Sequence, residues 1–304
     1  MADTPLSAEQ VSAKLAQMNL ALNPQIPYRY ESLFAKLEGW GAKGYIQRKH
    51  KLIRNVEGVL PQMLRPGEEV LYVGKGVYTS VIEQYFMGAL LAMLVNQTVF
   101  VLTNLRLIMI HSNTKGVPGH TFWTIFYNQI TTFKAAWTGT TKLHLRDGVK
   151  LTFSGFEKLD RKQMPAVFEQ ALAAYRELGF DPAVSQSREN LCSHCFEVVP
   201  KNIYRCSKCA AEFWTPTAIA LRSLIFPSWG DFLMRHTSAA ILELLGYVIT
   251  WLVLLTALVG GWARGMEDFI GALIVTVFVL AFEHGVDATL TYFVARKGLN
   301  PKRV

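Results

Sequence analysis

Charged residues and cysteine are both scarce in this sequence. Asp, Glu, Lys and Arg together make up 18% of the 304 residues, whereas an ordinary soluble domain has about 25%. Acidic residues are the scarcer kind, since 23 Asp and Glu against 31 Lys and Arg give a formal net charge of +8. Hydrophobic residues reach 51%, which excludes a disordered chain. So many apolar residues with so few charges predict a membrane-associated segment.

Recognisable catalytic motifs are absent as well. The sequence has no phosphate-binding loop of the Walker type, no Gly-x-Gly-x-x-Gly after a strand and no Gly-x-Ser-x-Gly. Its seven histidines form no His-Glu-x-x-His motif. These absences remove the reaction classes that have such local signatures, and we expect a protein that is not an enzyme. The first ten residues hold no apolar run, so we expect no secretory signal peptide.

The four cysteines lie close together in two Cys-x-x-Cys pairs, Cys192 with Cys195 and Cys206 with Cys209. Such clustering is typical of metal ligands in a reducing compartment rather than of disulfides. Four thiolates can hold one Zn²⁺ tetrahedrally and leave no position for water. The spacing therefore predicts a single structural zinc ion, with a redox role for the cysteines as the minor alternative.

Residues 191–214, which contain these cysteines, resemble a short zinc ribbon. The family usually has glycine after the second cysteine of each pair, and this sequence has Phe196 and Ala210 there. Zinc ribbons often bind nucleic acid, yet only Lys201, Arg205 and Lys208 are basic near the pairs. So sparse a set makes a poor phosphate-binding face, and a nucleic-acid-binding protein is therefore the least favoured function.

Residues 1–63 predict a helical and basic segment. Ser7 and Gln10 have capping-box spacing at the start of a helix over 7–22, and a weaker helical stretch covers 30–38. Five basic residues then follow with no acid among them. We expect this stretch to be exposed, either as a solvated helix face or as a surface attracted to anionic lipid headgroups. The five are Lys43, Arg48, Lys49, Lys51 and Arg54.

Residues 64–178 have the short apolar runs of an antiparallel β domain. Thr103-Asn104 between two such runs and Asp147-Gly148 between two others predict tight hairpins. About seven strands in close succession predict a barrel or sandwich. A helix over 164–178 ends the domain, with Gly179 as its stop. We place the uncharged run 85–95 as a buried strand or core segment of the barrel, since it is too short to span a bilayer as a helix; a membrane-dipping loop is the alternative.

Several of these motifs together resemble a bacterial pleckstrin-homology-like domain related to the GRAM group. They are Gly-Glu-Glu-Val-Leu at 67–71, Val-Leu-Thr-Asn-Leu-Arg-Leu-Ile at 101–108, the Asp-Gly hairpin and the closing helix. The resemblance implies a strongly bent β-barrel capped by its terminal helix, with loops that recognise a partner. Arg106 and Lys134, both in predicted strands, are candidates for contact with that partner.

Two apolar segments near the carboxyl end, 239–260 and 269–295, are each long enough to cross a bilayer. Six basic residues flank their outer ends and one lies in the connecting loop, so we expect both chain ends in the cytoplasm and the hairpin in the cell (inner) membrane. The six are Arg222, Arg235, Arg296, Lys297, Lys302 and Arg303. Residues 179–190 are expected to be a linker and 296–304 a basic tail.

An interfacial helix and a turn are predicted over 215–236, with Thr215 as the helix N-cap. Within it, Leu-Ile-Phe-Pro-Ser-Trp-Gly-Asp at 224–231 resembles a segment of small bacterial membrane proteins that often follows a zinc ribbon. Ser228 replaces the usual glycine of that segment.

Three acids lie within the predicted spans, namely Glu243, Glu283 and Asp287. In an antiparallel hairpin they reach one depth near the cytoplasmic side. They either extend to the headgroups or pair with Arg222, Arg235 or Arg296, or they form a proton or cation site. The first alternative makes the chain a non-enzymatic membrane-anchored adaptor with a lipid or protein partner, which is our expectation. The second makes it a small transporter or channel component.

Overall fold

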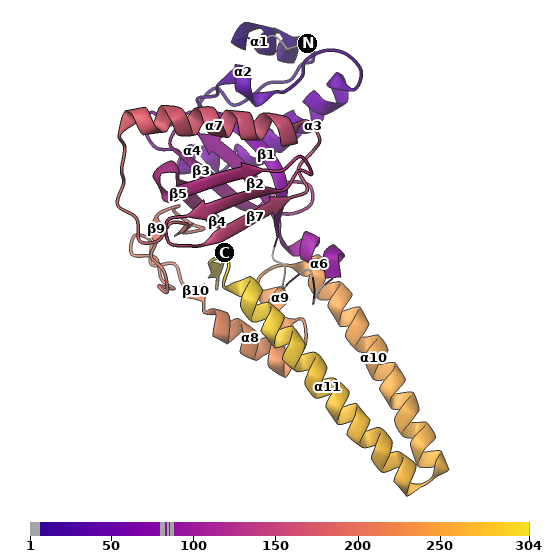
Figure 1. The fold of residues 1–304 in the computed structure, drawn as a ribbon. Coiled ribbons are helices and arrows are strands. Elements are labelled where there is room, and N and C mark those ends of the chain that lie inside the picture. Colours follow the sequence, from indigo (N-terminus) through magenta and orange to yellow (C-terminus); the bar gives the residue numbers. More distant parts are fainter. Residues whose placement is uncertain (1–6, 80–82, 84, 86–87, 304) are drawn as a thin grey trace. The chain divides into compact units, whose positions relative to one another are not determined.

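The computed structural model describes residues 7–79, 83, 85 and 88–303 (Figure 1). The chain forms two compact units. One contains Met1–Val81 and Asn96–Ala211, and the other contains Ile82–Val95 and Glu212–Val304. Two apolar helices and a four-cysteine cluster accompany a large antiparallel sheet, so the predicted combination of parts is present.

Short helices precede the sheet of the first unit. Helix α1 (Ala8–Gln17) begins at the predicted capping box, in which the Ser7 N–H donates to Gln10 Oε1 at 2.9 Å and the Gln10 N–H donates to Ser7 Oγ at 3.2 Å. It stops before residue 22 because the chain turns at Asn19, where φ is +53°. The other three are α2 (Tyr30–Leu33), α3 (Ala42–Val56) and α4 (Leu60–Met63).

Seven consecutive strands form the body of the sheet in the order β5-β6-β7-β1-β2-β3-β4, with antiparallel neighbours. Both predicted hairpins are confirmed, although Asn104 and Leu105 rather than Thr103 and Asn104 connect the first. The strands are β1 (Val70–Thr79), β2 (Gln97–Thr103), β3 (Arg106–Ser112), β4 (Pro118–Phe126), β5 (Ile130–Ala135), β6 (Thr141–Leu145) and β7 (Lys150–Ser154).

The expected closed barrel does not form within the described residues. A 3₁₀ turn, η1 (Tyr127–Gln129), separates β4 from β5, and these two strands lie far apart in the strand order. Strand β4 pairs instead with β8 (Glu189–Leu191), which pairs with β9 (Val198–Val199). The result is one open sheet of nine strands, which includes β8 and β9 from the cysteine segment and the residues just before it.

Both faces of this sheet are covered, which explains why every residue of β2 is buried. Phe100 and Leu102 point toward α7 (Asp160–Leu178), which ends at Gly179 with φ +61° as predicted. Val99 and Val101 point the other way, into a core shared with the helices of residues 8–63. The amino-terminal segment is therefore part of the core of this unit rather than an appendage.

The second unit consists mainly of helices. Residues 88–95 belong to it as helix α6, so their placement as a barrel strand is wrong. Ala, Leu and Met, which are all strong helix formers, make up most of this run. The remaining elements are β10 (Phe213–Trp214), α8 (Pro216–Ile225), α9 (Trp229–Leu233), α10 (Thr237–Arg264), α11 (Met266–Ala295) and β11 (Asn300–Pro301).

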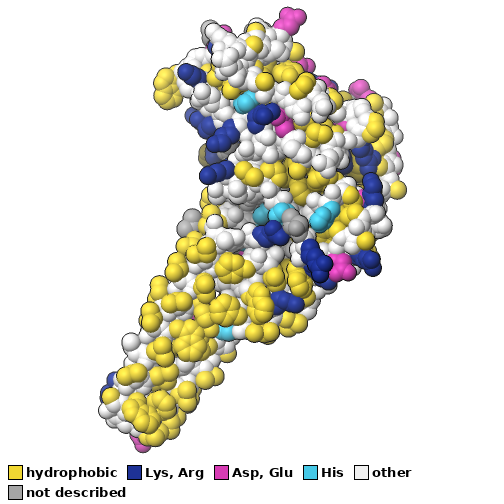
Figure 2. All heavy atoms as spheres, turned by 180° about the vertical axis from the view of Figure 1, so that it is seen from behind, with side chains coloured by type: hydrophobic (Ala, Val, Ile, Leu, Met, Phe, Trp, Pro, Cys, Tyr) yellow, Lys and Arg dark blue, Asp and Glu magenta, His cyan; other side chains and the backbone are white. Residues whose placement is uncertain are grey.

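Helices α10 and α11 lie side by side as an antiparallel pair of 28 and 30 residues (Figure 1). Each is long and apolar enough to cross a membrane, and only 6% of its most apolar window is buried. Hydrophobic side chains cover the face of this pair that Figure 2 shows. At their base, α8 begins at the predicted N-cap, where Thr215 Oγ1 accepts from the Ala218 N–H at 3.2 Å.

Candidate functional site

The four cysteines converge as the sequence predicts. Their Sγ atoms all lie within 4.8 Å of one another. Across the two pairs, Cys192 Sγ lies 3.5 Å from Cys209 Sγ, and Cys195 Sγ lies 3.5 Å from Cys206 Sγ. Such a set of four soft ligands could hold one metal ion such as zinc.

Each cysteine pair is shaped by the same backbone turn. The Phe196 N–H donates to Cys192 O and the Ala210 N–H donates to Cys206 O, both at 3.0 Å. Both residues have positive φ, +55° for Phe196 and +58° for Ala210. The glycine expected at these positions is thus replaced without loss of the left-handed backbone, which costs a non-glycine residue about 1–2 kcal/mol.

The surroundings of the sulfurs fit a bound cation. Burial raises the pKa of the Cys192 thiol to about 12. Burial also opposes ionisation of Cys206, but hydrogen bonds from the N–H groups of Cys209 and Lys208, together with those from the Cys195 and Cys209 thiols, lower the pKa of the Cys206 thiol to about 7. The His194 N–H faces Cys192 Sγ at 3.4 Å. A bound metal ion displaces the thiol protons, and its positive charge offsets the cost of burying the cysteines as thiolates.

A second cluster consists of three acids in the helical unit. Carboxylate oxygens of Asp231, Glu243 and Asp287 all lie within 4.8 Å of one another, and each comes from a different helix: α9, α10 and α11. The sequence predicts Glu243 and Asp287 but misses Asp231, which precedes the spans. Glu283 is not a member, and its Oε2 is buried without a hydrogen-bond partner.

Hydrogen bonds from neighbouring groups orient these acids. Asp287 accepts from the Ser228 N–H at 2.9 Å and from Thr291 Oγ1 at 3.3 Å. Asp231 Oδ1 lies 3.1 Å from His236 Nδ1. Burial and the charge of Lys297 lower the pKa of His236 to about 4, whereas burial and the charge of Asp287 raise the pKa of Asp231 to about 7.

Pairing of the acids with nearby arginines, one of the predicted alternatives, does not occur in the described part of the chain. None of Glu243, Glu283 and Asp287 forms an ion pair with lysine or arginine there. Two of these arginines lie over aromatic rings instead. Arg222 lies over the Trp214 ring at 4.3 Å and Arg296 over the Tyr292 ring at 5.5 Å.

The basic stretch is exposed only in part. Four of its five basic residues are exposed as expected, namely Lys43, Lys51, Arg48, which pairs with Glu157, and Arg54, which pairs with Glu57 at 2.7 Å. The expected exposure of Lys49 is wrong, because this side chain is 2% exposed. It lies on the buried face of α3 with Tyr45, Ile46, Ile53 and Val56.

Lys49 is held in the interior by specific contacts. Its Nζ lies 2.9 Å from Asp160 Oδ1 and 3.6 Å from the centre of the Tyr72 ring. The Tyr72 hydroxyl donates to the same Asp160 oxygen at 2.5 Å. Burial lowers the pKa of Lys49 while the Asp160 charge opposes that shift. This contact joins α3, β1 and α7.

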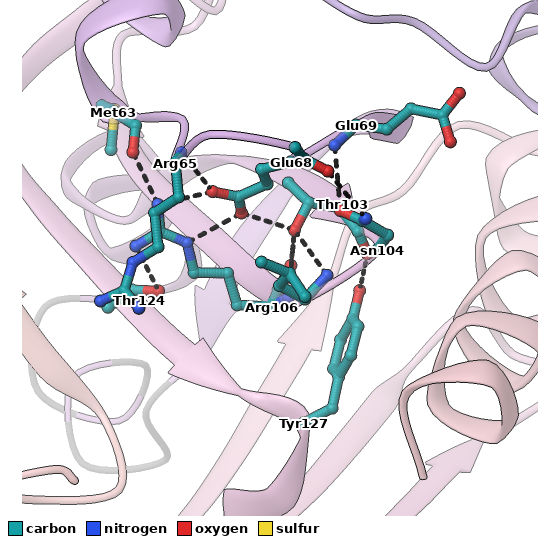
Figure 3. Close-up of polar contacts among 11 residues, drawn as sticks. Met63, Arg65, Glu68, Glu69, Thr103, Asn104, Arg106, Thr124 and Tyr127 are labelled. Carbon is teal, nitrogen blue, oxygen red and sulfur yellow. Dashed lines mark hydrogen bonds and ion pairs between the residues drawn. The ribbon is translucent and has the colours of Figure 1, made fainter. Parts of the chain in front are cut away.

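Arg106 is also buried rather than exposed, contrary to the sequence prediction. It donates to Glu68 and, through Nη2, to Met63 O at 2.6 Å (Figure 3). Thr103 Oγ1 donates to Glu68 Oε1 at 2.7 Å, and the Tyr127 hydroxyl donates to Thr103 O at 2.6 Å. The Leu-Thr-Asn-x-Arg-Leu motif therefore locks a hairpin to the segment before β1.

Comparison with known proteins gives little. No protein-family model matches the sequence, and no curated protein matches it. One similar solved structure is the "C-terminal domain of an unknown protein from Leishmania infantum". It is 14% identical, and the match covers 39% of this chain and 98% of that chain, with a TM-score of 0.29.

Proposed function

We propose that the chain is a non-enzymatic, membrane-anchored adaptor whose β domain recognises a lipid or protein partner. The observation that carries the proposal is the pair of long helices with exposed apolar surfaces. At about 1.5 Å per residue, helices of 28 and 30 residues are each longer than the thickness of the roughly 30 Å hydrocarbon layer. Exposure of such a large apolar surface to water is unfavourable, and insertion of the two helices into a bilayer removes that free-energy cost.

Helix α8 supports the same placement at the base of the pair. Leu221, Leu224, Ile225 and Phe226 are all partly or largely exposed large hydrophobic residues. A short helix with such a surface suits the interface between headgroups and acyl chains. The basic residues at the outer ends of the spans favour cytoplasmic ends in the cell membrane.

The β domain is the proposed recognition module of a pleckstrin-homology-like fold. That resemblance implies a bent β-barrel capped by its terminal helix. The described residues form an open sheet rather than a barrel, and the antiparallel order of β1 to β7 with α7 packed on one face supports the proposal. Trp137, between β5 and β6, is 94% exposed, and Lys134 on β5, three residues earlier, is also exposed. An exposed aromatic ring and an exposed cation on one strand and the loop that follows it suit contact with a partner or an anionic surface.

The cysteine cluster is proposed to bind one structural Zn²⁺. Four protein ligands leave no open position for a reacting water, so the ion would order the loops that follow β8 and β9 rather than perform chemistry. The protein partner is unidentified, and the basic residues near the cysteines remain too few to favour nucleic acid.

Membrane topology provides the direct test. Gly265 lies between the two spans and Lys302 lies beyond the second. A cysteine placed at Gly265 should react with a membrane-impermeant reagent in intact cells, and one placed at Lys302 should react only after lysis. If alkaline carbonate extracts the protein from membranes, the proposal that the two helices anchor it in the bilayer is wrong.

The acid cluster favours a second candidate, a transporter or channel component. The variant Glu243→Gln, Glu283→Gln, Asp287→Asn separates the two functions. An adaptor keeps membrane insertion and partner binding in this variant, whereas Lys134→Glu weakens partner binding. Loss of the cellular phenotype at normal protein level and normal partner binding would instead make the helical pair the active part.

A further inference from the structure

We propose that Asp231, Glu243 and Asp287 bind one hard divalent cation, of the class of Mg²⁺, Ca²⁺ and Mn²⁺, with Ser228 as an additional oxygen ligand. This site is separate from the four-cysteine cluster, which offers only sulfur. It also goes beyond the adaptor function, since neither membrane insertion nor partner recognition requires it.

The spacing of the three acids fits such an ion. Their oxygens lie within 4.8 Å of one another. Oxygen ligands of Ca²⁺ lie about 2.3–2.6 Å from the ion, so two ligands on opposite sides of it are about 4.6–5.2 Å apart. Three carboxylates from three helices can therefore surround a single ion without large movement of the backbone. Oxygen-only ligands suit hard cations such as Mg²⁺, Ca²⁺ and Mn²⁺.

Ser228 supplies an independent observation. Its side chain is completely buried, and its Oγ has no partner in hydrogen-bonding geometry. The backbone at Ser228 has φ +69°, its N–H donates to Asp287, and its hydroxyl lies beside the Glu243 carboxyl. Glu243 Oε2 is likewise buried without a partner. A buried polar atom without a partner calls for an explanation, and an ion bound between Ser228 Oγ and Glu243 Oε2 would satisfy both atoms.

The charges nearby do not supply that group. Three carboxylates this close repel one another unless a cation or protons reduce their charge. The described residues offer the acids no ion pair with lysine or arginine, and Lys297 lies 2.5 Å from Glu83. A bound divalent cation would balance most of the charge and would also satisfy Ser228 Oγ.

The groups behind the acids hold them as a metal site requires. His236 Nδ1 contacts Asp231 Oδ1, and Thr291 Oγ1 contacts both Asp287 and Ser223 Oγ. Ser223 Oγ in turn accepts from the Gly230 N–H at 3.0 Å. Ligating carboxylates are commonly oriented by such outer hydrogen bonds. The ion would tie α9 to both long helices at the base of the pair.

Binding of Mn²⁺ to the purified full chain in detergent tests the proposal. The chain is first loaded with one equivalent of zinc, which the four thiolates bind, and free Mn²⁺ is then followed by electron paramagnetic resonance. We expect one Mn²⁺ per chain, displaced by Ca²⁺ or Mg²⁺. Asp231→Asn and Asp287→Asn should each weaken binding at least tenfold, and Ser228→Ala should weaken it several-fold.

Glu283→Gln is the matched control, because it removes a carboxylate from the same helix as Asp287 but outside the cluster. It should bind Mn²⁺ as the wild type does. Ser228→Ala guards against misfolding of the acid variants, since it leaves all three carboxylates in place. The proposal fails if the wild type binds no Mn²⁺ at millimolar concentration. It also fails if Glu283→Gln weakens binding as much as Asp287→Asn does.

Discussion

Arg106 donates from Nε and Nη2 to the two carboxylate oxygens of Glu68, at 2.8 and 2.9 Å, with both side chains buried (Figure 3). Removal of one partner of such a pair leaves the other as an uncompensated charge, which typically costs about 3–5 kcal/mol. Arg106→Glu also places two like charges together. We therefore expect the opening free energy of the β2 and β3 amides to fall by at least that amount in hydrogen exchange.

Lys134→Glu is the control for this prediction. Lys134 is exposed on β5, where a charge change is expected to stay within about 0.5 kcal/mol. If both variants lose the same opening free energy, the buried Arg106–Glu68 ion pair does not contribute specifically to stability.

Lys49 and Lys51 provide a second matched pair, two residues apart on α3. Lys49→Met leaves the buried Asp160 with only the Tyr72 hydroxyl, and we expect a loss of about 3 kcal/mol. Lys51→Met removes an exposed charge and should change stability by less than about 0.5 kcal/mol. Denaturant midpoints of α3 and α7, read by hydrogen exchange, give the comparison. A larger effect of Lys51→Met would contradict the burial argument.

Ala210→Gly tests the left-handed turn at the cysteine cluster. Ala210 is exposed with φ +58°, so glycine relieves about 1–2 kcal/mol of backbone strain in the folded state. Glycine also gives the unfolded chain more conformational entropy, which offsets part of that gain. We expect a net gain of about 0.5–1 kcal/mol, seen as tighter zinc binding in competition with a chelator.

Phe196→Gly should act in the opposite direction although it makes the same backbone change. The Phe196 ring packs edge-on against Phe122 on β4 with centroids 5.1 Å apart. Loss of that contact should outweigh the relief of strain, so zinc should bind less tightly than in the wild type. Equal behaviour of the two glycine variants would show that the ring contact does not matter.

Cys206→Ser tests whether the metal orders only its own surroundings. We expect zinc content to fall from about one ion per chain to nearly none. Amide protection should be lost in β8 and β9 but kept in β2 and β3, because those strands lie between two apolar cores. Loss of protection throughout the sheet would show instead that the unit cannot fold without the ion.

Gly230→Ala should disturb the packing of α9. A Cβ at Gly230 would lie 2.3 Å from Thr291 Cγ2 and 2.6 Å from Ser223 Oγ. Overpacking of this kind costs about 1–3 kcal/mol. At Gly246 on α10 nothing lies within 4 Å of such a Cβ, so Gly246→Ala should raise stability by up to about 1 kcal/mol. Thermal unfolding in detergent measures both.

Local signals in the sequence predicted the parts that depend on local chemistry. The capping box at Ser7, the Asp-Gly turn, Gly179 and the cysteine spacing all act over a few residues, and each is confirmed. The two long helices were predicted because length and apolar composition suffice for that purpose.

Long-range pairing could not be predicted in the same way. Lys49 pairs with Asp160 and Arg106 pairs with Glu68 across more than thirty residues of chain. Because the partners are so far apart in sequence, Lys49 and Arg106 were predicted to be exposed charged residues. Asp231 joined the acid cluster only because α9 folds back beside α10 and α11. A short apolar run such as 88–95 fits a strand or a helix equally well by its pattern alone.

The pairing of β8 with β4 links the proposed metal site to the edge of the large sheet. Unpaired strands at the rim of a sheet are templates for association between chains. The pairs Phe122 with Leu191 and Thr124 with Glu189 cover part of the β4 rim. If the cysteines hold zinc as we propose, a chain without the ion would release this cover and present β4 to other copies. We then expect the protein to aggregate more readily when zinc is scarce.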